Sequence, residues 1–323
     1  MADLPGKETG TGREIWPGKE IWRGGVTPWQ CDEMGHMNVQ FYLAIASQGL
    51  AGLAAMLGMP HAFTAGASST LLLREHHVRF LKEARAGAGL VMTGGLLDIG
   101  ETGASLLQML FHATGEPAAA ITAKVEHVTP RDLRPFPWTR TTRERVDAMR
   151  IEAPEFARPR SIALNPVTTM ASLKQAEAMG LPVVSGGAIM PIDCDVFGRM
   201  LPDQLLNRLY ASVGHMIRPS EEALLQAQPD LKGRLGGAAV EYRAVYHGWP
   251  RAGDRVEMRS GHRELTAKAR RVVHWLLDPT SGRPWASAEM VSLFLDLQAR
   301  RSLTLSPEAL QAMAVEPIGE LGL

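Results

Sequence analysis

Residues 26–37 read VTPWQCDEMGHM, and residues 189–200 read IMPIDCDVFGRM. The two stretches share a proline, a cysteine, an aspartate, a glycine and a methionine in the same order and at the same spacing. The offset between them is 163 residues (Asp32 to Asp195, 195 − 32), which is close to half of the 323-residue chain. A motif that returns after half the chain indicates two copies of one structural unit.

Two shorter echoes follow the motif in the same order in both halves. Arg85-Ala86-Gly87 recurs as Arg251-Ala252-Gly253, and Gly115-x-Pro117 recurs as Gly282-x-Pro284. Their offsets are 166 and 167 residues (251 − 85 and 282 − 115), so the offset grows slowly along the chain. Small insertions into a duplicated domain produce such a drift, and we infer a tandem duplication.

In each copy the motif leads into a helical stretch. The first helix is predicted from Asn38 to Leu57, and it is apolar on nearly all sides, which is typical of a helix buried in a core. Asn38 is a suitable N-cap residue. The second helix is predicted from Pro202 to Ile217, with Pro219 marking its end.

A short strand is expected before each motif, and four strand-like runs follow each helix. Partial alternation, β-branched residues and breaks that contain Gly, Pro or Asp favour antiparallel strands joined by hairpins. The runs are 68–81, 89–100, 104–114 and 117–128 in the first copy, and 236–246, 254–265, 269–277 and 285–297 in the second. The chain is therefore predicted to be an α+β protein with two tandem copies of a curved antiparallel sheet wrapped around a central helix.

This layout gives the expected domain boundaries. Residues 1–137 form the N-terminal domain, residues 138–182 a linker with short helices, and residues 183–323 the C-terminal domain. A terminal helix is expected after Ser306, which is a suitable cap for it.

Composition excludes several classes of protein. With 34 Lys and Arg residues against 34 Asp and Glu residues, the chain has no basic excess for binding nucleic acid. No apolar run approaches the roughly 20 residues of a membrane span, and the polar N-terminus lacks the apolar core of a signal peptide. No Cys/His spacing indicates zinc, and two cysteines make no disulfide framework. We therefore expect a cytoplasmic protein with no metal site.

The motif resembles one found in the hotdog-fold thioesterases. In these proteins the usual string before the helix is Asp-x-Asp-x-x-Gly-His-x-Asn, and here residues 30–38 read QCDEMGHMN. The similarity is to the 4-hydroxybenzoyl-CoA thioesterase-like group of acyl-CoA thioesterases, whose second strand and turn also resemble VRFLKEARAGAGL (78–90). The resemblance implies a double hotdog, in which the two copies form an internal pseudo-dimer.

The resemblance also implies a reaction in which Asp32 is the nucleophile, or the general base for water, at a thioester carbonyl. An exposed Asp is a weak base because its reference pKa is about 3.9, so this carboxylate must be partly desolvated or must attack directly. N–H groups around Asn38 and Val39 would stabilise the oxyanion, and Gly35 allows the tight turn before the helix. His36 would orient the substrate, polarise its carbonyl or act as a base.

Each of these residues also has a plain structural interpretation. Asp32 would bond loop amides, His36 would be a solvated loop residue, and Asn38 would cap the helix rather than bind substrate. Cys31 and Cys194 are interpreted as small buried residues on a strand that point away from the aspartate, rather than as thiol nucleophiles.

The second copy departs from the motif. His36 is matched by Arg199 and Asn38 by Leu201, while Asp195 is retained. Asp195 would work in a second site or be a relic in a copy kept for folding, and we favour a single site in the first copy. The candidate contacts for coenzyme A phosphates are the arginines Arg79, Arg85, Arg199, Arg243 and Arg251.

The expected function is hydrolysis of an acyl-CoA or acyl-carrier thioester to an acid and a free thiol, with no cofactor beyond the coenzyme A of the substrate. Two alternatives stay open: a non-catalytic acyl-CoA binding module, and an acyl-CoA hydratase or dehydratase. The hydratase class is less similar, because its Asp and His stand at another spacing, within a string with Asn and Pro. The acyl chain, its carrier and the pairing of two chains into a homodimer are left open by the sequence.

Overall fold

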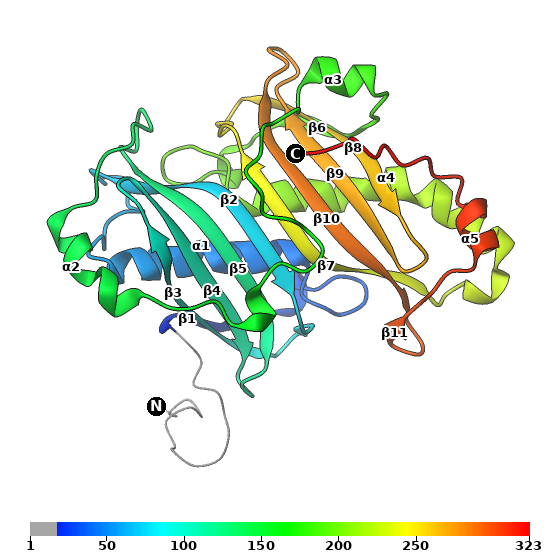
Figure 1. The fold of residues 1–323 in the computed structure, drawn as a ribbon, viewed down its shortest axis with the longest axis horizontal. Helices are drawn as coiled ribbons and strands as arrows, with labels where there is room; N and C mark the ends of the chain where they lie inside the picture. Colours follow the sequence, from blue (N-terminus) through cyan, green and yellow to red (C-terminus); the bar gives the residue numbers. More distant parts are fainter. Residues whose placement is uncertain (1–17) are drawn as a thin grey trace. The chain divides into compact units, whose positions relative to one another are not determined.

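The computed structural model describes residues 18–323, and the chain divides into two compact units between Arg158 and Pro159. This division falls inside the stretch 138–182 that was predicted to be a linker. Each unit is described separately below, with the element labels of Figure 1.

The first unit is a five-stranded antiparallel sheet with one long helix. Its strands run in the order β1-β3-β4-β5-β2. Their bounds are β1 Lys19–Gly25, β2 Thr70–Phe80, β3 Gly89–Ile99, β4 Gly103–His112 and β5 Pro117–Val128. The helical elements are η1 Pro28–Gln30, α1 Val39–Met56, α2 Arg140–Met149 and η2 Glu155–Ala157.

The second unit repeats the sheet and its long helix, and adds the short elements β11, η4 and α5. Its strands run in the order β6-β8-β9-β10-β7, with the short β11 paired to β10. Their bounds are β6 Val183–Ala188, β7 Leu235–Tyr246, β8 Arg255–Leu265, β9 Ala269–Leu277, β10 Pro284–Asp296 and β11 Arg301–Ser302. The helical elements are α3 Leu173–Ala178, η3 Pro191–Asp193, α4 Asp203–Ala227, η4 Pro229–Leu231 and α5 Pro307–Ala312.

Both units therefore have the predicted order of elements along the chain, one strand, a long helix and then four strands, and the strand bounds lie close to the predicted runs. In each unit the long helix follows the motif and lies along its own sheet (Figure 1). The predicted cap of the terminal helix is also confirmed, because the Ser306 side chain accepts a hydrogen bond from the N–H of Ala309 in α5.

Helix α1 is the core helix of the first unit, and two glycines let it approach β1. A Cβ at Gly52 would lie 2.3 Å from the carbonyl oxygen of Ile21, and a Cβ at Gly49 would lie 3.2 Å from the Ile21 side chain. Within the described residues, α1 is also the one helix that is long and apolar enough to span a membrane. It was not identified from the sequence, in which no apolar run of that length was found. The buried α1 residues are Tyr42, Leu43, Ile45, Ala46, Gly49, Leu50, Leu53 and Ala54, so its apolar composition matches a core position.

Helix α4 corrects the sequence prediction, because it continues through Pro219 to Ala227 instead of ending at Ile217. A proline inside a helix lacks one N–H donor and costs about 3 kcal/mol. Ser220 bonds the Ile217 carbonyl with its hydroxyl at 2.7 Å. The second half of the helix is held by tertiary packing, since Leu224 is fully buried in a cluster with Phe294 and Leu305.

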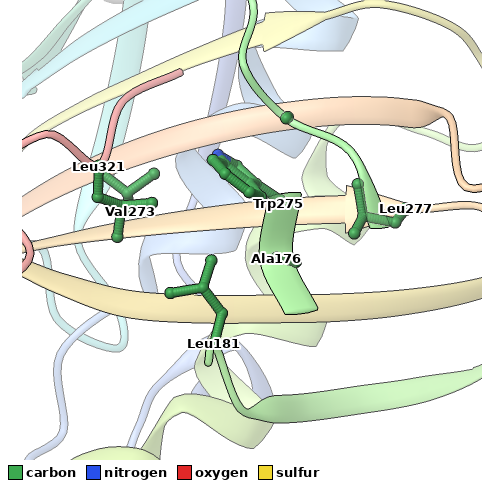
Figure 2. Packing of buried hydrophobic residues seen from close by; sticks show 7 residues of the cluster. Ala176, Leu181, Val273, Trp275, Leu277 and Leu321 are labelled. Carbon is green, nitrogen blue, oxygen red and sulfur yellow. The ribbon is translucent and has the colours of Figure 1, made fainter. Parts of the chain in front are cut away.

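Segments outside the sheets complete both cores. In the first unit, Ile151 and Phe156 pack on buried residues of β4 and β5. In the second unit, Trp275 of β9 packs with residues of the segment before β6 and of the C-terminal segment, among them Leu181 and Leu321 (Figure 2). The indole N–H of Trp275 donates to the Gly322 carbonyl at 2.8 Å, which fixes the C-terminal segment on the sheet.

Candidate active site

The motif of the first copy forms a tight loop between η1 and α1. The N–H of Asp32 donates to the His36 carbonyl at 2.9 Å, and the N–H of Gly35 donates to the Asp32 carbonyl at 3.0 Å. Gly35 has φ +77°, a left-handed conformation that residues with a Cβ rarely adopt. The glycine predicted for a tight turn therefore stands where the backbone requires it.

The carboxylate of Asp32 is half-buried, and only one of its oxygens holds the loop. Oδ1 accepts the N–H of Met34 at 2.9 Å and the N–H of His36 at 3.1 Å. Oδ2 accepts no hydrogen bond from any residue of the described part of the chain. Asp32 thus bonds loop amides, as its structural interpretation predicts, and still presents a free carboxylate oxygen.

In the second copy the corresponding oxygen is occupied. Oδ1 of Asp195 accepts the N–H of Phe197 at 2.9 Å and the N–H of Arg199 at 3.0 Å, which repeats the loop of the first copy. Oδ2, however, accepts Nε of Arg199 at 2.9 Å and lies 2.7 Å from its Nη2. The Arg199 side chain is only 5% exposed, so Asp195 is held in a largely buried ion pair.

The start of α1 corrects one expectation about the oxyanion site. The N–H of Asn38 is not available, because it donates to the Gln30 carbonyl at 2.9 Å. The Asn38 side chain caps the helix by accepting the N–H of Gln40 at 3.1 Å, which confirms its structural interpretation. The N–H of Val39 has no hydrogen-bond partner among residues 18–323, and it lies at the positive end of the helix dipole.

The second copy lacks this donor. The N–H of Leu201 donates to the Asp193 carbonyl at 2.8 Å, as that of Asn38 does to Gln30. The next residue, at the position of Val39, is Pro202, which has no N–H. The carboxylate of Asp193 accepts the N–H of Met190 and pairs with Arg208, so it serves the turn.

His36 contacts two charged side chains through one ring nitrogen. Its Nε2 lies 2.9 Å from Oε2 of Glu83 and 2.9 Å from Nη2 of Arg85. The backbones of His36 and Arg85 also form an isolated antiparallel bridge. His36 is thus a half-buried partner in a charged cluster rather than a solvated loop residue, since its side chain is 15% exposed.

Glu83 was not predicted from the sequence. It lies two residues before Arg85, which belongs to a repeated Arg-Ala-Gly turn, and the second copy has Trp249 at its position. A difference between the copies next to a repeated turn is the signal that would have singled it out.

The two cysteines correct another expectation. Both are half-buried and lie at the ends of the 3-10 helices η1 and η3, not buried on a strand. Each thiol donates to a carbonyl four residues earlier, Cys31 to Thr27 at 3.7 Å and Cys194 to Met190 at 3.4 Å. Burial and the nearby carboxylates raise the pKa of Cys194.

Three of the arginines suggested for coenzyme A phosphates are committed to other groups. Arg79 donates to the Arg158 carbonyl at 2.6 Å, and the buried Arg243 donates to the carbonyls of Ala163 and Asn165. Arg199 is held by Asp195. Arg85 contacts His36, and Arg251 donates to the Phe197 carbonyl at 3.2 Å.

One pocket lies away from this loop. This shallow pocket is lined by Thr129, Arg134, Pro135, Phe136 and Pro137. The pocket follows Val128, the last residue of β5. Val128 pairs with Thr70, which is at the opposite end of β2 from Phe80 and the Asp32 loop.

Among the described residues, no group of three or more His, Cys, Asp or Glu side chains could hold a metal ion.

The comparisons with known proteins fit the duplicated architecture. The family model described as "Thioesterase-like superfamily" matches residues 26–146 and 190–313, one segment in each copy. No curated protein matches the chain.

Two solved structures align with most of the chain. One is a protein of Lactobacillus plantarum assigned as an oleoyl thioesterase, with 11% identity and a TM-score of 0.62 over 86% of this chain and 97% of that one. The other is a 12:0-ACP thioesterase from Umbellularia californica, with 11% identity and a TM-score of 0.58 over 84% of this chain and 92% of that one. At this identity the likeness shows the fold, a tandem pair of hotdog units.

Proposed function

Because the chain belongs to the thioesterase-like superfamily, we propose that it hydrolyses an acyl thioester to a carboxylic acid and a free thiol, at one site in the first copy. The observation that carries this proposal is the difference between two loops of the same backbone geometry. Asp32 keeps a free carboxylate oxygen, and the next helix begins with a free N–H. In the second copy an arginine occupies the oxygen, and a proline replaces the N–H.

The free oxygen Oδ2 of Asp32 is the reactive group of the proposed site. In direct attack it forms an anhydride with the acyl group and expels the thiolate, and water then opens the anhydride. As a general base it takes a proton from the water that attacks the carbonyl. Either route consumes one water molecule per thioester, and both start from the same free oxygen, because the hydrogen bonds to Oδ1 hold the carboxylate in place.

The N–H of Val39 is the proposed oxyanion donor. Negative charge develops on the thioester oxygen when the carbonyl is attacked, and a donor fixed by the helix backbone needs no reorganisation to meet it. The dipole of the 18-residue α1 adds positive potential at the same place.

Apolar rings border the first turn of α1 and suit the acyl part of a substrate. Trp29 of η1 lies edge-on to Phe41 of α1, with ring centroids 5.4 Å apart, and its side chain is 72% exposed. Within a proposal of thioester hydrolysis, we take acyl-CoA as the substrate class, with an acyl-carrier protein as the other carrier to be tested.

A thiol-release assay tests the proposed function. Wild type is given short, medium, long and aromatic acyl-CoAs and an acyl-carrier protein, with Asp32→Asn as the inactive control. We expect release from at least one class by wild type, and its loss in Asp32→Asn. If no thioester is cleaved while acyl-CoAs still raise the melting temperature, the chain is a binding module and the proposed function is wrong.

A further inference from the structure

The proton on His36 depends on two side chains that contact the same nitrogen. Nε2 lies 2.9 Å from both Nη2 of Arg85 and Oε2 of Glu83. A guanidinium only donates hydrogen bonds, whereas a carboxylate only accepts them. Nε2 must carry a proton to pair with Glu83 and must lack one to pair with Arg85, so the two contacts exclude each other.

The choice between these partners decides what the other ring nitrogen does. In a neutral imidazole, Nδ1 accepts hydrogen bonds when the proton is on Nε2, and it donates when Nε2 is bare. Nδ1 has no hydrogen-bond partner among residues 18–323. It is therefore the nitrogen of His36 that is left to contact water or substrate.

The His36 backbone is bonded to Asp32 in two places. Its N–H donates to Oδ1 of Asp32 at 3.1 Å, and its carbonyl accepts the N–H of Asp32 at 2.9 Å. A change of tautomer at His36 thus changes a donor into an acceptor on a residue whose backbone is bonded to Asp32.

We propose that Arg85 is a positioning residue of this site: it holds Nε2 of His36 without a proton, in competition with Glu83, and so keeps Nδ1 as an N–H donor to the thioester. The inference deepens the proposed thioester hydrolysis and rests on it for its catalytic consequence. The location of the proton itself does not depend on that function.

The surroundings of His36 contain few other charged groups. Asp32 lies in its own loop, and Glu83 and Arg85 face its Nε2, with 3.9 Å between Oε2 and Nη2 of that pair. Tyr42 of α1 is hydrogen-bonded to the backbone at Ala84, and burial, with Glu83 and Asp32 nearby, raises the pKa of its hydroxyl to about 12. Tyr42 therefore stays neutral, and Glu83 is the competitor of Arg85.

The second copy supplies a matched control. Arg251 repeats Arg85 in sequence and forms the same backbone bridge, there to Arg199. No imidazole lies beside it at the position of His36, and its guanidinium donates to the Phe197 carbonyl instead. Replacing Arg251 removes the same charge and turn residue without touching the cluster at His36.

The test is ¹⁵N NMR of histidine-labelled protein, with His36→Asn to assign the signal. We expect the Nδ1–H form in wild type, in Glu83→Gln and in Arg251→Leu, and the Nε2–H form in Arg85→Leu, which has no donor for Nε2. Thiol release by Arg85→Leu is expected to fall several-fold, because Nδ1 then loses the proton that it donates to the thioester.

An unchanged tautomer in Arg85→Leu would overturn the assignment, as would an equal change in Arg251→Leu. The NMR signal separates this inference from the proposed function. If the tautomer changes as expected while no thioester is cleaved by wild type, Arg85 sets the proton on His36 and the proposed hydrolysis is wrong.

Discussion

At the residue scale, the two aspartates of the repeated motif show how one loop serves two purposes. Asp32 and Asp195 hold their loops with the same pair of backbone hydrogen bonds. The residue four positions later decides the rest, because Arg199 reaches back to its aspartate, while His36 contacts Glu83 and Arg85 instead. A retained aspartate is therefore no evidence of a retained active site.

The start of α1 gives a prediction at the same scale. Val39→Pro removes the unpaired N–H but suits the first helical position, and Asn38 already has ψ 141°, which a following proline requires. We expect kcat for thiol release to fall about 10²- to 10³-fold, as for the loss of one oxyanion donor. The melting temperature, measured by calorimetry, should change little.

Val39→Ala is the control for the lost side chain, since it keeps the N–H. Equal activity in Val39→Pro and Val39→Ala would show that this amide does not stabilise the oxyanion.

The sequence predicted part of this site. The resemblance of the motif selected Asp32 as the candidate catalytic residue, and the expected tight turn selected Gly35, whose left-handed backbone the structure shows. It could not show that the Asn38 amide is used by the Gln30 carbonyl, or that Glu83 meets His36. The first contact closes the motif on itself, and the second depends on how the later loop that contains Glu83 returns to the motif.

At the element scale, close backbone contact between α1 and β1 controls how the helix sits on its sheet. Gly52→Ala would place a Cβ 2.3 Å from a backbone oxygen of β1, which cannot move aside as a side chain could. We expect the free energy of unfolding to fall by about 1–3 kcal/mol, measured in urea.

Gly214→Ala in α4 is the matched control, because a Cβ there meets no atom within 4 Å. Because this helix position is open, replacing Gly214 with Ala should raise the free energy of unfolding by about 1 kcal/mol. A destabilised Gly214→Ala or a neutral Gly52→Ala would contradict this account of α1.

The elements were also the part of the fold that the sequence predicted best. Alternating strands with Gly and Pro between them gave bounds close to the observed ones, such as 117–128 for β5. The predicted end of α4 was wrong. Pro219 is a local signal for the end of a helix, but the packing of Leu224 with Phe294, which lies far away in the chain, holds the helix beyond it.

At the scale of the whole molecule, buried histidines make both units sensitive to acid. Burial lowers the pKa of His76 to about 3, of His274 to about 3 and of His262 to about 4. In the unfolded chain histidines bind protons near pH 6.5, so between pH 6.5 and pH 4 the unfolded state holds more protons. The stability that these neutral rings provide is therefore lost as the pH falls.

We expect the free energy of unfolding to decrease by about 2 kcal/mol per buried histidine between pH 6.5 and pH 5. Urea unfolding at pH 7.5, 6.5 and 5 measures the slope. His274→Gln, which can still bond Ser260, should reduce the slope by about one proton. A stability that does not change over this range would show that the buried rings are not the cause.

The central claim is that a duplicated fold contains one working site, and thiol release by two matched variants tests it most directly. Asp32→Asn and Asp195→Asn make the same chemical change at equivalent positions of the two loops. Rates of thiol release are compared per folded molecule, on the substrate that wild type cleaves best. We predict that Asp32→Asn abolishes release, and that Asp195→Asn keeps it while lowering the melting temperature, because Arg199 is left buried without its partner. Full activity in Asp32→Asn, or its loss in folded Asp195→Asn, would contradict the claim.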